Sequence, residues 1–394
     1  MAKLRIGNRQ LQISSNLEFA PQILSQDTKC FTLHMGCDKR WGLPYATRNL
    51  QTDSADFEAI CFAIWSLLPD CRFELSYAPL SWGKCFPPDY ENCDSRLLPL
   101  REKNLRLKAE KKKPSTDTPE SRIRHYMRFL YRVMKMRKLY GDLFSVAKEN
   151  RAEVDAFAVL YEKAMADGRL LMDIPKAKSD IKDGEGRKKN GESVVSENHL
   201  EKWFVLHPDC TEIVDACGEV RLFDQLPCSL FCGDTLADIS KKNQLLNTGY
   251  FDLWGKNASE LHLFELKRLG NDKLGVISEL FFYSCLMKDF MQIAPRQFAA
   301  NAVANSEKPD ARGFDDFVAF AKENRFLRTH FLVPRVYSFF AEPEVREGLL
   351  RAMNRRADGV AYDFIVFDQN KLVGGESQAQ IQDFLKKLKK EWNS

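Results

Sequence analysis

The stretch Phe251–Lys267, FDLWGKNASELHLFELK, places three charged residues within two apolar runs that read as β-strands. Asp252 interrupts the first run, and Glu265 and Lys267 end the second. Burying a charged group is costly unless the group is paired. The stretch therefore predicts one of two things: exposed charges at the end of a hairpin, or a site that uses them.

The register of this hairpin indicates which side chains meet. We take Lys256–Ser259 as a four-residue loop, which pairs Asp252 with Leu263. Residues directly opposite each other share a face of the sheet, and the faces alternate along each strand. Asp252 is therefore expected on the same face as Glu265 and Lys267, with Glu265 as its diagonal neighbour. A three-residue loop would break this parity.

The charges on that face suit a metal site. The opposite face of the second strand is also apolar, which is typical of a central strand covered on both sides. Two carboxylates buried side by side repel each other, and a divalent cation would relieve that repulsion. Oxygen ligands suit Mg²⁺ or Mn²⁺. A cation between Asp252 and Glu265 would activate water, and Lys267 would stabilise the developing charge. This chemistry hydrolyses phosphodiester bonds.

The segments around the hairpin alternate between helix and strand patterns. This alternation predicts an α/β domain with a central mixed sheet flanked by helices. The expected elements are a helix ENHLEKWFVLH, strands near Val220–Gln225, Gly249–Trp254 and Leu261–Lys267, a helix Leu274–Met291, strands THFLVPRV and YDFIVFDQ with a helix between them, and a last helix SQAQIQDFLKKLKKEW.

Asp252, followed after twelve residues by the triplet Glu265–Lys267, resembles the D-x(n)-E-x-K signature of the PD-(D/E)XK nuclease superfamily. The words DLWG and FELKR are similar to RecB-like and NucS-like members. The resemblance covers Glu197–Gln369. The proline that the superfamily places before its first aspartate is absent, because Phe251 stands there. The resemblance implies a restriction-endonuclease-like core within residues 196–394.

The resemblance also implies roles for particular residues. The superfamily begins its core with a helix that carries an acidic residue. Glu197 matches that residue, and Glu201, one turn later, is the alternative. Glu279 lies on the helix after the E-x-K strand and would support the lysine. The implied catalytic set is Asp252, Glu265, Lys267 and Glu197, of which the three carboxylates would bind Mg²⁺ or Mn²⁺.

Two polar stretches, Ala109–Ser121 and Pro175–Ser196, read as linkers rich in Lys, Ser, Gly and Pro. They divide the chain of 394 residues into three expected parts. These are a small N-terminal α/β domain (1–108), a basic helical segment (118–174) and the nuclease-like domain (196–394).

The net charge of +4 conceals a basic segment, since residues 101–138 hold 14 Lys and Arg against 4 Asp and Glu. Such a segment favours an anionic partner, most commonly nucleic acid. Four of its cations recur one turn apart on a predicted helix, which is either a solvated face or a face that contacts phosphates. They are Arg124, Arg128, Arg132 and Lys135.

Other classes of protein are disfavoured. The N-terminus lacks the apolar core of a signal peptide, and the 11 cysteines form no Cys-x-x-Cys pair, which favours a reduced cytoplasmic protein. Cys30, His34 and Cys37 lack a second pair of zinc ligands. Lone histidines such as His262 are expected to be structural. No phosphate-binding loop is present, which disfavours ATP hydrolysis.

We therefore expect a Mg²⁺-dependent endonuclease that cuts DNA, with a role in restriction or phage defence. RNA is the alternative substrate. Two other functions stay open: a catalytically inactive nucleic-acid-binding or assembly module with the same fold, and a DNA-repair nuclease. Cutting both strands usually needs two active sites, which favours a homodimer. The N-terminal domain would recognise the target or a partner protein, and no membrane contact is expected.

Overall fold

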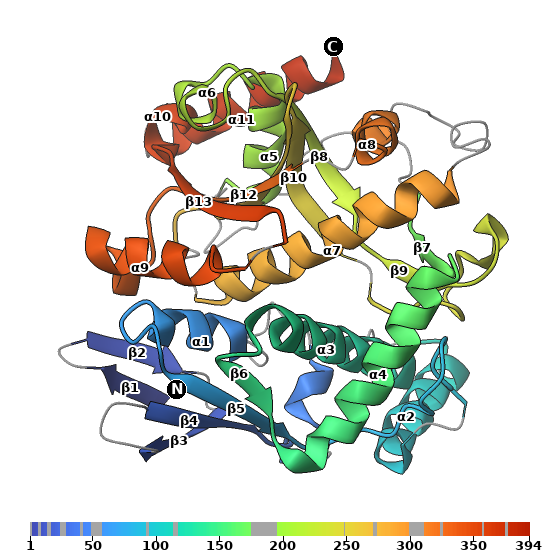
Figure 1. Ribbon diagram of the computed structural model, residues 1–394. Coiled ribbons are helices and arrows are strands. Elements are labelled where there is room, and N and C mark those ends of the chain that lie inside the picture. The colour runs from blue at the N-terminus through green and yellow to red at the C-terminus, as the bar shows by residue number, and fades with distance from the viewer. Residues whose placement is uncertain are drawn as a thin grey trace.

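The computed structural model describes residues 2–6, 9–13, 17–23, 29–39, 42–48, 57–91, 94–112, 117–174, 195–247, 249–270, 274–298, 311–323, 326–356, 358–374 and 377–394. The chain forms two halves, each built around its own β-sheet, with helices of both halves packed between the sheets (Figure 1). One hydrophobic core contains residues of both halves.

The C-terminal half contains the mixed sheet that the sequence predicts. Its five strands lie in the order β13-β12-β11-β10-β8. The first three strands along the chain pair antiparallel, and the last two add in parallel. The strands are β8 (Arg221–Pro227), β10 (Tyr250–Lys256), β11 (Glu260–Leu266), β12 (Phe326–Val333) and β13 (Val360–Val366).

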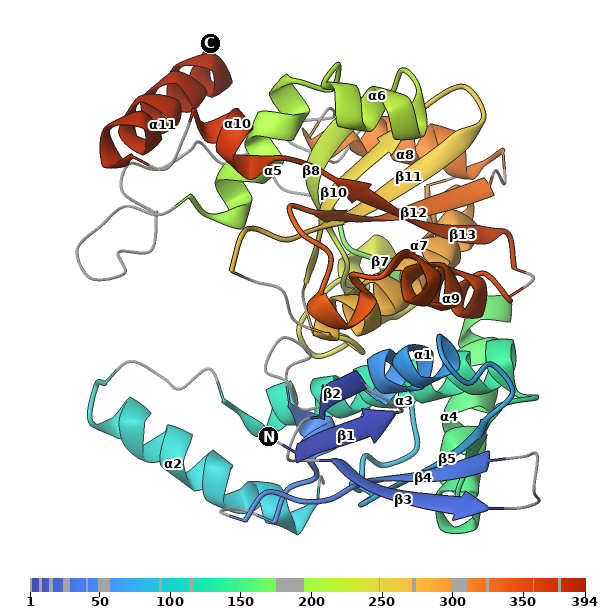
Figure 2. The same cartoon turned by 90° about the vertical axis from the view of Figure 1, so that its left-hand side faces the viewer.

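Helices cover both faces of this sheet (Figure 2). Among the described residues, none of the helices combines the length and the apolar character needed to cross a membrane. One face packs against α7 (Gly275–Gln297), α8 (Phe314–Ala321) and α9 (Pro343–Met353). The other packs against α5 (Glu197–Leu206), α6 (Thr211–Cys217), α10 (Gln369–Val373) and α11 (Gln378–Asn393).

The β10–β11 hairpin has a register that differs from the predicted one by two residues. Trp254 pairs with Leu263, whereas the predicted loop would have paired it with Leu261. Side chains alternate between faces with a period of two, so an even shift leaves each one on its predicted face. Asp252 and Glu265 therefore still share a face of the sheet, although the predicted pairing was wrong.

The side chain of Asn257 explains this shift. Its Oδ1 accepts hydrogen bonds from the backbone N–H groups of Ser259 (2.9 Å) and Glu260 (2.8 Å). An asparagine that bonds to the backbone two or three residues later is a common turn former. The turn therefore starts at Asn257, and Lys256, expected in the loop, joins the strand opposite Leu261.

The N-terminal half has a four-stranded sheet in the order β3-β4-β5-β6, and a separate two-stranded ribbon. The strands are β1 (Ala2–Ile6), β2 (Arg9–Ile13), β3 (Leu17–Ile23), β4 (Lys29–Met35), β5 (Arg72–Tyr77) and β6 (Phe144–Val146). The helices are α1 (Phe57–Trp65), α2 (Leu98–Ala109), α3 (Pro119–Tyr140) and α4 (Lys148–Ala166).

The predicted division between residues 1–108 and 118–174 differs from the structure. Strand β6, from the second of these segments, pairs with β5 from the first, so the two share one sheet. Strand β7 (Leu170–Met172) then pairs with β9 (Leu230–Cys232) of the C-terminal half. The N-terminal half is therefore a single α/β unit with a strand contact to the C-terminal half.

Candidate active site

The three charged residues of the hairpin lie together at one end of the C-terminal sheet, on the face covered by α7. The Nζ atom of Lys267 contacts Oε1 of Glu265 and lies 3.1 Å from Oε2 of Glu279 on α7. The Oδ2 atom of Asp252 accepts a hydrogen bond of 2.9 Å from the backbone N–H of Leu266. The structure thus brings Asp252, Glu265, Lys267 and Glu279 into one cluster.

Helix α5 adds two more carboxylates to this cluster. Glu197 lies in its first turn, and its Oε1 is 3.5 Å from the backbone nitrogen of Arg268, next to the lysine. Glu201 is buried, and its Oε2 accepts a hydrogen bond of 2.9 Å from Gln225. Burial raises the pKa of Glu201 well above its ordinary value, and the charge of Asp252 raises it further. Both of the alternative acidic residues therefore face the site.

The electrostatics of the cluster are dominated by burial of like charges. Burial raises the pKa of Asp252 to about 6, and the charges of Glu197 and Glu279 also raise it, against the opposing effect of Lys267. Burial raises the pKa of Glu265 well above its ordinary value, and the charge of Asp252 adds to this. In both groups burial is the largest cause, neighbouring carboxylates add to it, and the charge of Lys267 does not fully offset them.

Lys267 responds in the opposite direction. Burial alone would lower its pKa, but the neighbouring carboxylates, Glu265 and Glu279 foremost, raise it well above its ordinary value. The ammonium group is therefore charged at neutral pH. It balances only part of the negative charge, because the charges of four carboxylates act on it.

The donor set fits a hard divalent cation. Carboxylate oxygens are the protein ligands that Mg²⁺ and Mn²⁺ prefer. Asp252 and Glu265 face each other across the hairpin with raised pKa values, so a cation there would offset their repulsion. Asp252 and Glu265 could hold such an ion together with Glu197 or Glu201.

A largely apolar pocket lies beside Lys267 and follows β12. Aromatic side chains form much of its wall, and two arginines belong to its lining. The pocket has room for little more than a water molecule, and Phe331 and Phe340 are buried in its wall. The residues concerned are Phe331, Tyr337, Phe340 and Phe364, with Arg268 and Arg335.

The predicted phosphate-binding face of α3 is buried. Arg132 is 1% exposed and donates hydrogen bonds to both carboxylate oxygens of Glu58 on α1. Arg128 is 7% exposed and lies 2.9 Å from Nδ1 of His125. The prediction that these arginines contact nucleic acid was therefore wrong, because the folded chain covers them.

The two remaining cations of that face also have partners within the chain. The Nζ atom of Lys135 lies 2.8 Å from Oδ1 of Asp289 on α7. The Nε atom of Arg124 donates a hydrogen bond of 2.9 Å to Asn247. Helix α3 lies between the two halves, so its basic face contacts protein where the sequence suggested solvent or nucleic acid (Figure 1).

Sequence reasoning missed a second group of polar residues, under the opposite face of the same sheet. Cys217, His262 and His330 are all buried, and their potential ligand atoms lie within 4.8 Å of one another. They come from α6, β11 and β12. Their separation along the chain gives no local spacing signal.

Comparison of the chain with protein-family models, with curated proteins and with solved structures found no match. Function is therefore inferred from the chemistry and geometry of the site itself.

Proposed function

We propose that this protein is a metal-dependent endonuclease that hydrolyses phosphodiester bonds of DNA at the cluster of Asp252, Glu265 and Lys267. The observation that carries the proposal is the charged lysine buried among carboxylates at the end of the central strand. A functional site is where such strongly shifted pKa values concentrate.

The arrangement of elements supports the same proposal. A helix, three antiparallel strands, a helix and a parallel strand occur in this order as α5, β8, β10, β11, α7 and β12, with α6, β9 and α8 inserted between them. The resemblance to the PD-(D/E)XK superfamily implies this order for a restriction-endonuclease-like core. The carboxylates and the lysine lie at one end of that sheet, where a substrate can approach.

Each residue of the cluster would have a distinct role in hydrolysis. Mg²⁺ or Mn²⁺ held by Asp252, Glu265 and a carboxylate of α5 would polarise the phosphoryl oxygen and activate the attacking water. Lys267 would donate a hydrogen bond to a phosphoryl oxygen and stabilise its growing negative charge. Its raised pKa keeps the ammonium protonated, so it is a poor general base. Glu279 would hold the ammonium group in place from α7.

Two arginines near Lys267 suit a nucleic-acid substrate. Arg268 and Arg335 would contact phosphates. This role replaces the one predicted for the buried cations of α3. DNA is the proposed substrate, with RNA as the alternative. The proposed setting in restriction or phage defence rests on the combination of a nuclease-like domain with an additional N-terminal domain.

To test the proposal, the purified protein is incubated with supercoiled plasmid DNA in Mg²⁺ or Mn²⁺, and the rate of plasmid cleavage is measured. The variants are Asp252→Asn and Lys267→Met, and the matched control is Lys256→Met on the same hairpin, whose ammonium pairs with Asp316 at 2.6 Å. We expect cleavage by the wild type and the control. Losing one preorganised charge contact to the transition state should slow cleavage by about 10²–10³-fold.

Two outcomes would contradict catalysis. One is cleavage that survives both substitutions, and the other is a wild type that cuts neither DNA nor RNA with either ion. A wild type that binds DNA without cutting it would instead favour the alternative function, a nucleic-acid-binding or assembly module. Preference for nicked or damaged DNA over intact plasmid would favour repair.

A further inference from the structure

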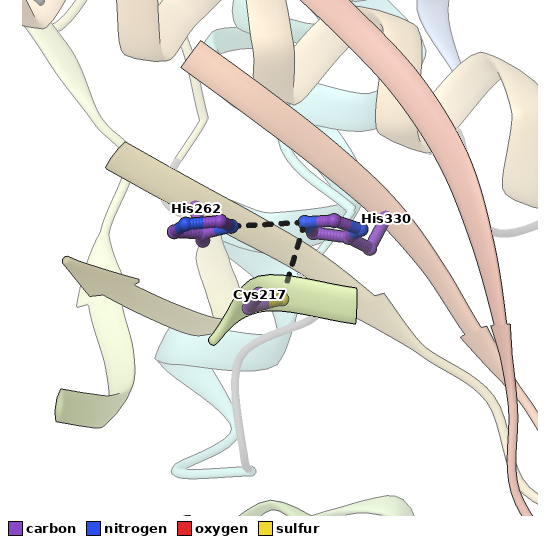
Figure 3. A group of neighbouring side chains, drawn as sticks. All are labelled: Cys217, His262 and His330. Atoms are coloured by element: carbon purple, nitrogen blue, oxygen red, sulfur yellow. Dashed lines mark hydrogen bonds between the residues drawn. The ribbon is translucent and has the colours of Figure 1, made fainter. Parts of the chain in front are cut away.

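The buried group Cys217, His262 and His330 lies on the face of the sheet away from the candidate active site (Figure 3). Both imidazoles are 0% exposed. The Nδ1 atom of His262 is 3.0 Å from Nε2 of His330, and that Nε2 is 3.6 Å from the sulfur of Cys217. The three potential ligand atoms all lie within 4.8 Å of one another.

These distances match those between ligands of a tetrahedral zinc ion. Zinc–nitrogen bonds of about 2.05 Å and zinc–sulfur bonds of about 2.3 Å place two nitrogens about 3.3 Å apart, and a nitrogen and a sulfur about 3.6 Å apart. The observed separations are 3.0 and 3.6 Å. Zinc also prefers imidazole and thiolate ligands to sites made mainly of carboxylates.

Hydrogen bonding alone does not satisfy this group. The Oδ1 atom of Asn257 accepts from two backbone N–H groups, so its Nδ2 must donate to Nε2 of His262, 3.0 Å away. Nε2 of His262 is therefore an acceptor, and the single proton of this buried neutral ring lies on Nδ1. That proton is donated to Nε2 of His330, and the thiol of Cys217 points at the same lone pair.

The other ring nitrogen of His330 then carries a proton without a partner. With Nε2 acting as acceptor in this buried neutral ring, the proton lies on Nδ1, which has no hydrogen-bond partner among the described residues. Two potential donors, Nδ1–H of His262 and the thiol of Cys217, converge on Nε2. Polar contacts within the protein therefore do not fully account for this group.

We propose that Cys217, His262 and His330 bind one zinc ion that fastens α6 to β11 and β12, with water in the fourth position. Zinc would displace the thiol proton of Cys217 and replace the two contacts that compete for Nε2 of His330.

Metal binding would also change the contacts of His262. When Nδ1 binds the metal, the ring proton moves to Nε2, so Nδ2 of Asn257 can no longer donate to that atom. Oε2 of Glu260 lies 3.9 Å from Nε2 and would have to move closer to accept this proton, as carboxylates beside metal-bound histidines commonly do. Arg328 holds Glu260 with hydrogen bonds of 2.9 and 3.0 Å.

The test uses the full-length protein, stripped with a chelator, loaded with Zn²⁺ or Co²⁺ and desalted. Bound metal is measured by mass spectrometry, and a cobalt–thiolate charge-transfer band reports a cysteine ligand. The variants are Cys217→Ser and His330→Gln. The controls are Cys285→Ala, a buried cysteine of α7, and Asp252→Asn, which removes a carboxylate of the candidate active site.

We expect the wild type and both controls to keep about one equivalent of zinc and to show the cobalt–thiolate band. The variants at Cys217 and His330 should lose both, and zinc should raise the melting temperature of the wild type but not theirs. A wild type that retains no zinc, or a Cys217→Ser protein that keeps the band, would overturn the proposal. If either variant fails to fold, the band and the zinc-induced melting shift of the wild type and Asp252→Asn decide.

Discussion

Helix α7 separates two clusters of buried charge that differ in their balance. Toward the sheet, the charges of four carboxylates act on Lys267. Toward the N-terminal half, Arg132 meets Glu58 through two hydrogen bonds, and Ser278 of α7 donates a third to Glu58 at 3.1 Å. Buried charge alone therefore does not identify a site. What distinguishes the first cluster is the excess of carboxylates, which a bound cation would offset.

The largest effect should come from breaking the balanced pair. Replacing Arg132 by Met leaves the Glu58 carboxylate buried without its partner, which should lower the free energy of unfolding by about 3–5 kcal/mol. Urea denaturation measures this loss. The control Arg137→Met, on the same helix, removes an exposed ion pair with Asp155 and should cost at most about 1 kcal/mol. Equal losses in the two variants would contradict the distinction between them.

Removing a carboxylate from the unbalanced cluster should have the opposite sign. In EDTA, Asp252→Asn should increase the free energy of unfolding by about 1–2 kcal/mol at neutral pH, because a repulsive charge is lost. Asp316→Asn serves as the control, since Asp316 is paired with Arg221 and Lys256 and should lose stability when neutralised.

The gain for Asp252→Asn should also depend on pH in a defined window. The pKa of Asp252 rises from 3.8 to about 6 on folding. Between these values the folded protein keeps a proton that the unfolded chain has lost, so this group makes stability fall as pH rises from about 4 to about 6. The difference between variant and wild type should therefore grow across that window and level off above it. A difference that is constant from pH 4 to pH 7 would refute the shift.

The smallest effect concerns the cations of α3. Arg124 is hydrogen-bonded within the chain, so Arg124→Gln should change the dissociation constant for DNA by less than about twofold and leave its salt dependence unchanged. Arg335 lines the pocket and is exposed, so Arg335→Gln should reduce the salt slope by about one unit. Fluorescence anisotropy at several salt concentrations separates the two results.

Hydrophobic periodicity predicted the five strands of the C-terminal sheet and the helices α5, α7, α9 and α11, because each has a strong local pattern. The shorter elements α6, α8, α10 and β9 were not predicted. The shared face of Asp252 and Glu265 was also predicted correctly, although the loop was misplaced, since the error was an even number of residues. Which acidic residue of α5 reaches the site was left open from sequence, and the structure places both Glu197 and Glu201 there.

The failures share a physical cause, which is that partners distant along the chain leave no local pattern. The basic stripe of α3 looked like a surface because its partner Glu58 lies 74 residues away. Cys30, His34 and Cys37 are close in sequence but were disfavoured as zinc ligands, and His34 is exposed and bonded to Ser76. The group around His262 escaped notice because only the folded sheet assembles it.

Two contacts between the halves limit how this protein can be shortened. Strand β7 pairs with β9, and α7 packs against both the C-terminal sheet and helices of the N-terminal half. A fragment beginning at residue 196 would lack the partner of β9 and uncover aromatic side chains of α7. Phe281 packs against Phe62, and Phe282 against Tyr131. The C-terminal half would then expose an apolar surface where the whole chain has an internal contact. A shortened protein would therefore need polar substitutions on that surface of α7 in addition to a new N-terminus.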